Sequence, residues 1–112
     1  MSEPDPKAAK RLAYLEKVTS GGSEDAMAWY GLAMEYRALE RFEDALRTFE
    51  TLRDKHPSYV AMYLMAGGTL QSMGRTADAR AWYESGIVAA RKAGNGHAAS
   101  ELESALGQLD AN

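Results

Sequence analysis

Apolar residues in the middle of the chain recur at offsets of three, four and seven, which is the spacing of one helix face. The first such face consists of Trp29, Leu32, Ala33 and Tyr36. The same offsets return 34 residues later, at Tyr63, Ala66, Gly67 and Leu70. A second pair of positions also recurs at this lag, Ala45 and Phe49 as Ala79 and Tyr83. The pattern predicts a helical repeat, with Trp29 and Phe49 in its core.

Between the two copies, the stretch 42–55 has a single apolar stripe and charged residues on its other faces. The stripe consists of Phe42, Ala45, Leu46, Phe49 and Leu52. This pattern is typical of an amphipathic helix with one side in solvent. It predicts that each repeat pairs an inner helix with an outer one.

Cap and turn residues divide the rest of the chain. We predict a tail at 1–5 and one domain at 6–112, with an N-terminal helix at 6–19 that Asp5 caps and Pro6 starts. Repeats are predicted at 26–59 and 60–93, and a C-terminal capping helix at 97–109. The expected N-caps of the later helices are Ser23, Ser58 and Thr76, and Gly74 and Gly94 suit turns. This gives about six helices and an all-α fold.

The period and the side chains resemble the tetratricopeptide repeat, whose pattern is W-x2-L-[GA]-x2-Y, then A-x3-[FY], then Pro. The first copy ends with Pro57, whereas the second has Arg91 at that position. The chain is also similar to small bacterial proteins of this family through its YGLAMEY and SELESAL segments. The resemblance implies a short stack of helical hairpins that binds other proteins and is not an enzyme.

Composition excludes several other functions. The net charge is −3, so no bulk basic field exists to hold nucleic acid. The chain has no cysteine, which fits a reducing cytoplasm and excludes thiolate chemistry. The polar residues 1–17 do not resemble a signal peptide. The longest uncharged run, 58–74, is shorter than the roughly 20 apolar residues of a spanning helix, so we expect no membrane insertion.

No motif for a metal, phosphate or dinucleotide occurs, and we expect no cofactor. His97 and Glu101 are four apart and could share a metal, but no third ligand is evident and a solvated helix face is the simpler interpretation. Tyr14 lies near Lys10 and Arg11, which could contact nucleic acid, although an ordinary amphipathic helix explains them better.

The inner helices are apolar on the face opposite the repeat signature as well. A helix that is apolar nearly all round is normally covered on both sides. In tetratricopeptide proteins this second face lines a concave groove that binds peptides. The predicted partner-binding residues are therefore Met27, Tyr30, Met34, Arg37, Leu64, Met65, Gly68 and Gln71.

Three explanations of this second face remain open from the sequence. A peptide or an amphipathic segment of a partner protein could occupy the groove. Alternatively, the chain could be a structural homo-oligomer that buries the groove against a second copy. The protein's own helices could also fill it.

Overall fold

The computed structural model describes residues 5–111, which form six helices and no strand. Residues 1–4 of the predicted tail and Asn112 lie outside the described residues. The chain divides into two compact units, Met1–Lys55 and His56–Asn112. The expected all-α architecture is confirmed, whereas folding as one domain remains a prediction. The unit boundary lies before the 59/60 repeat boundary that the sequence pattern gives.

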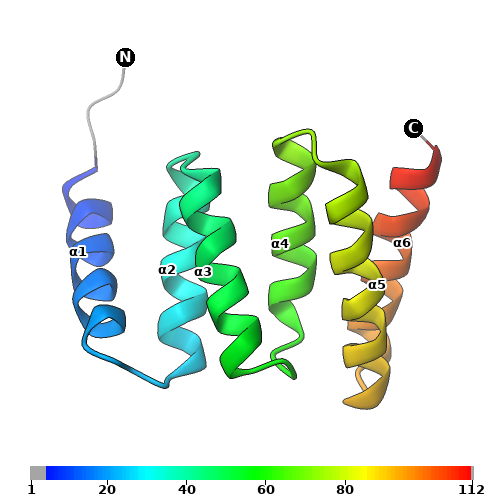
Figure 1. Ribbon diagram of the computed structural model, residues 1–112, viewed down its shortest axis with the longest axis horizontal. Coiled ribbons are helices and arrows are strands. Elements are labelled where there is room, and N and C mark those ends of the chain that lie inside the picture. Colours follow the sequence, from blue (N-terminus) through cyan, green and yellow to red (C-terminus); the bar gives the residue numbers. More distant parts are fainter. Residues whose placement is uncertain (1–4, 112) are drawn as a thin grey trace. The chain divides into compact units, whose positions relative to one another are not determined.

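The first unit contains α1 (Pro6–Ser20), α2 (Ala26–Ala38) and α3 (Phe42–Lys55). Helices α2 and α3 form an antiparallel hairpin, and α1 packs on α2 (Figure 1). Phe49 of α3 is fully buried, and its ring packs on that of Tyr30 in a T-shaped arrangement with a centroid distance of 6.4 Å. The amphipathic pattern of the stretch 42–55 thus places its apolar stripe in the interior of this hairpin.

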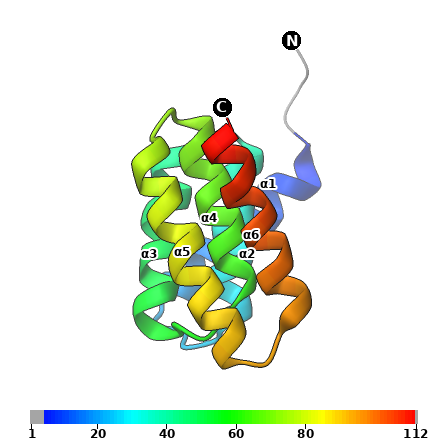
Figure 2. The ribbon, with the colours of Figure 1, turned by 90° about the vertical axis from the view of Figure 1, so that its right-hand side faces the viewer.

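The second unit contains α4 (Ala61–Ser72), α5 (Thr76–Lys92) and α6 (Gly96–Ala111). Helix α6 packs on both α5 and α4, as Figure 2 shows. Leu102 of α6 is buried against α5, where a β-carbon added to Gly86 would lie 3.0 Å from Leu102 Cδ2. The last helix therefore covers the second hairpin, as a capping helix does.

The helix N-termini differ in part from the predicted caps. Asp5 caps α1 as expected, because its carboxylate accepts a hydrogen bond from the Lys7 amide. Ser23 is not the cap of α2: Asp25 takes that position and accepts from Met27 N. Ser58 and Thr76 do not cap either, since α4 and α5 have no side-chain cap at all. A good capping residue one or two positions away thus does not decide where a helix starts.

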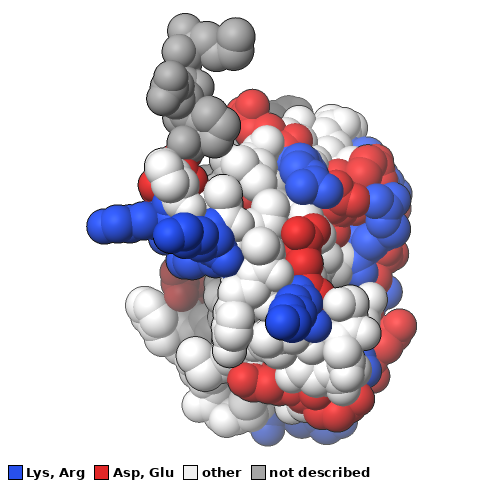
Figure 3. All heavy atoms as spheres, turned by 90° about the vertical axis from the view of Figure 1, so that its left-hand side faces the viewer, with Lys and Arg blue, Asp and Glu red and all other residues white. Residues whose placement is uncertain are grey.

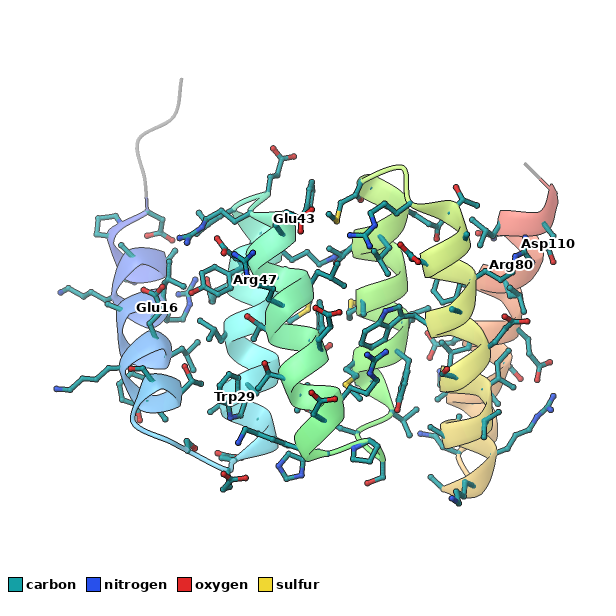
Figure 4. All side chains as sticks on the ribbon, viewed as in Figure 1. Glu16, Trp29, Glu43, Arg47, Arg80 and Asp110 are labelled. Carbon is teal, nitrogen blue, oxygen red and sulfur yellow. The ribbon has the colours of Figure 1, made fainter. Side chains whose placement is uncertain are left out.

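The predicted core position of Trp29 is only partly correct. Its ring is half-buried, its indole N–H donates to Ser23 O at 2.7 Å, and the Lys55 ammonium lies 5.6 Å from the ring centroid. Trp29 lies between α1 and α2, as Figure 4 shows. The indole needs a polar partner for its N–H, so it packs beside the loop instead of inside the hairpin.

Candidate functional site

The four predicted residues of α2 lie along one stripe of that helix, at offsets of three, seven and ten. Met27 is 72% exposed, whereas Tyr30, Met34 and Arg37 are half-buried. The Nε atom of Arg37 is buried and has no hydrogen-bond partner within residues 5–111. A buried donor without an acceptor costs free energy.

The four predicted residues of α4 form a matching stripe in the second unit. Leu64, Met65 and Gly68 are half-buried, and Gln71 is exposed. Gln71 is already engaged, because its Oε1 accepts a hydrogen bond from the Tyr83 hydroxyl of α5. The structure thus brings each set of four together on its own helix, and no apolar side chain of the described α4 stripe is as exposed as Met27.

A cleft of about 440 Å³ lies between α1 and α2, away from the predicted stripe. Its lining residues are Glu16, Lys17, Thr19, Ser20, Trp29, Leu32 and Tyr36. Glu16 accepts a hydrogen bond from the Tyr36 hydroxyl at 2.6 Å, and Figure 4 shows its position on α1. Arg11 pairs with Glu35 at 2.8 Å, so two polar contacts attach α1 to α2.

The environment of Tyr36 changes its acidity. Burial, followed by the hydrogen bond to the Glu16 carboxylate and the charge of that carboxylate, raises the pKa of Tyr36 to about 12. The Arg41 guanidinium lies 4.6 Å from the centroid of the Tyr36 ring. The phenol is therefore a neutral hydrogen-bond donor at physiological pH, with a structural role between the two helices.

A second cavity, of about 340 Å³, lies in the second unit between α5 and the loop that precedes α4. The sequence pattern alone did not predict this cavity. A signal was present, because Val88 lies on the otherwise polar side of α5, four residues after Glu84 and four before Lys92. In the structure, the Val88 side chain is 66% exposed.

Charge on the face of the first unit that carries α1 is mixed. Figure 3 shows lysine and arginine side chains interspersed with acidic ones on this face, with uncharged surface between them. In α3, Asp44 pairs with Arg41 at 2.8 Å and also with Arg47. The hydrogen bond from Arg41 lowers the pKa of Asp44. Among the described residues of this face, basic side chains therefore lie beside acidic ones.

Metal-ligand geometry is absent from the described residues. His97 Nε2 lies 3.3 Å from Glu101 Oε1, but no group of three histidine or acidic side chains converges within residues 5–111. Within the same range, no helix is long and apolar enough to cross a membrane. The pair on α6 is therefore a surface contact.

Comparison with known proteins identifies the relatives of the chain. Residues 30–98 match the family model of the tetratricopeptide repeat. The TPR repeat-containing protein PA0015 of Pseudomonas aeruginosa is 29% identical over 96 residues, which cover 86% of this chain and 91% of that protein.

Solved structures agree with this match. A tetratricopeptide repeat domain protein from Salinibacter ruber is 33% identical, with a TM-score of 0.75 over 78% of this chain and 88% of that one. The type III secretion translocator chaperone SycD of Yersinia enterocolitica has a TM-score of 0.83, over 93% of this chain and 72% of its own. At 13% identity, this second likeness concerns the fold alone.

Proposed function

Because the chain belongs to the tetratricopeptide repeat family, we propose that it is a non-catalytic module that binds a peptide or an amphipathic segment of a partner protein. The tetratricopeptide repeat is a protein–protein interaction fold. We assign the binding residues to the α2 stripe, Met27, Tyr30, Met34 and Arg37, and to the α4 stripe, Leu64, Met65, Gly68 and Gln71.

The observation that carries the proposal is the exposed Met27 side chain at one end of the α2 stripe. Arg37, whose Nε has no partner among the described residues, lies ten residues further along the same helix. Methionine adapts its shape to different apolar partners, and Tyr30 adds a large ring with a polar tip. The half-buried guanidinium of Arg37 would donate to an acceptor on the partner and set the orientation of the segment. The α4 stripe supplies only half-buried apolar surface, so α2 is the main anchor.

This composition determines the expected ligand class. Some tetratricopeptide domains cage an acidic carboxyl terminus with several cationic and amide side chains. The two stripes here contain one cation, Arg37, and one amide, Gln71, which already binds Tyr83. Binding is therefore driven mainly by apolar area, with weak salt dependence and no measurable affinity for acidic tail peptides.

The test compares two exposed apolar residues. Met27→Glu should abolish partner capture from the native lysate, because the carboxylate would be buried in an apolar contact. Tyr14→Glu is the matched control, since Tyr14 is 66% exposed on α1 and lies outside both stripes. Equal capture by both variants would contradict the assignment.

The alternative function is that of a structural homo-oligomer that buries the same surface. Sedimentation at several concentrations distinguishes this self-association from binding of a partner protein. A concentration-dependent mass that Met27→Glu abolishes and Tyr14→Glu retains would identify a second copy as the occupant. A monomer that still captures a partner would support the peptide-binding function. Unchanged helical circular dichroism in both variants verifies that the fold is retained.

A further inference from the structure

The cavity of the second unit lies apart from the residues of both proposed stripes. Its lining residues are Pro57, Ser58, Tyr63, Ser85, Val88, Ala89, Lys92 and Ala93. No residue of the α4 stripe is among them. The four residues from α5 lie at offsets of three, four and seven, so they form one face of that helix, and Ala93 is its C-cap.

The walls of the cavity are mainly apolar. Val88 is 66% exposed and is the one large apolar side chain of the described second unit with such exposure. Ala89, Ala93 and Pro57 extend this surface, and the Tyr63 hydroxyl is already bonded to Pro57 O at 2.5 Å. A ligand with an apolar body would remove the valine surface from water.

Apart from the bonded Tyr63 hydroxyl, the polar side-chain groups of the cavity are the Lys92 ammonium and the hydroxyls of Ser58 and Ser85. The arginines of this unit all have acidic partners: Arg75 with Asp78, Arg80 with Asp110, and Arg91 with Glu103. Figure 4 shows the Arg80–Asp110 pair between α5 and α6.

Lys92, in contrast, has no acidic partner within the described part of the chain. The side chains of Ser58 and Ser85 likewise make no hydrogen bond there. Helix α4 begins at Ala61, three residues after Ser58, without a side-chain cap, so the positive end of its dipole is not compensated. The Lys92 ammonium and the start of α4 favour an anion, and the two hydroxyls can donate hydrogen bonds to it.

From this combination we propose that the cavity binds a small carboxylic acid with an apolar body. The carboxylate would pair with the Lys92 ammonium and accept from the serine hydroxyls, and the body would pack on Val88 and Ala89. A volume of about 340 Å³ is at the low end of ligand pockets, which suits a phenyl or branched-chain group and is too small for a helix.

The experiment is a two-dimensional NMR titration of the full chain with 3-phenylpropanoate and, separately, with 3-phenylpropanamide. The acid should shift the amide signals of Ser58, Val88 and Ala93. The amide has the same apolar body and no charge, so it should bind about tenfold more weakly. Equal binding of acid and amide, shifts confined to other residues, or no shifts would overturn the proposal.

Substitutions test whether the Lys92 charge is responsible for binding the acid. Lys92→Gln should reduce the affinity for the acid to that for the amide, whereas Lys10→Gln, at an exposed lysine of α1, should leave it unchanged. Val88→Asp should weaken binding of both compounds. A Lys92→Gln protein that binds the acid as the unmodified chain does would contradict the assignment.

Discussion

The Tyr83 ring lies directly against the backbone of Gly67, so closely that a β-carbon on Gly67 would be 2.2 Å from Tyr83 Cε1. Tyr83 has little room to move, because it is buried and its hydroxyl donates to Gln71 Oε1. This contact sets the distance between α4 and α5. In the first repeat, Ala33 occupies the equivalent position and is also fully buried.

We expect Gly67→Ala to lower the free energy of unfolding by about 1–3 kcal/mol, the usual cost of overpacking. The matched control is Gly107→Ala in α6, where an added β-carbon meets nothing within 4 Å. That change should raise stability by up to about 1 kcal/mol, because alanine loses less conformational entropy in a helix. Urea denaturation of the two variants measures both effects, and a neutral Gly67→Ala would show that the helices separate easily.

The two large aromatic residues of the first repeat should differ in their contribution to stability. Phe49→Ala deletes a fully buried ring and should cost about 3–5 kcal/mol. Trp29→Ala should cost less, because its ring is half-buried and the lost hydrogen bond joins it only to the Ser23 carbonyl. Thermal unfolding of both variants gives the order, and a larger loss for Trp29→Ala would place the tryptophan in the core after all.

The contact between Tyr36 and Glu16 predicts an alkaline loss of stability. The folded pKa of about 12 lies above the unfolded value near 10, so the folded state holds its phenolic proton longer. The stabilisation is complete below about pH 10 and disappears as the pH rises towards 12. Tyr36→Phe should therefore show a smaller decrease in stability between pH 9 and 11 than the unmodified chain. An identical decrease in both proteins would mean that another group is responsible.

Deleting residues 97–112 should expose the surface of α5 that α6 covers. Leu102 and Leu109 of α6 are buried, and their loss would uncover apolar area around Gly86 and Ile87. We expect the truncated chain to bind a hydrophobic dye and to aggregate. Removing only residues 111–112 is the control, since Leu109 stays in place. A truncated chain that remains monomeric and equally stable would show that α6 is dispensable.

The sequence by itself determined the helices, their pairing into repeats and the family. Each of these depends on local spacing: the offsets of three and four place Leu32 and Tyr36 on one face wherever the helix packs. Gly74 and Gly94 could be assigned to turns for the same reason, and both have positive φ angles.

Only the tertiary structure decided which side chains remain available. Periodicity gives the direction of Gln71 and Lys92 on their helices but not their partners, which come from elements distant in sequence. Gln71 is bound by Tyr83, whereas Lys92 has no acidic partner among the described residues. The half-burial of Trp29 and the cavity beside Val88 likewise depend on neighbouring helices and loops, because a cavity is a property of packed surfaces and not of one helix.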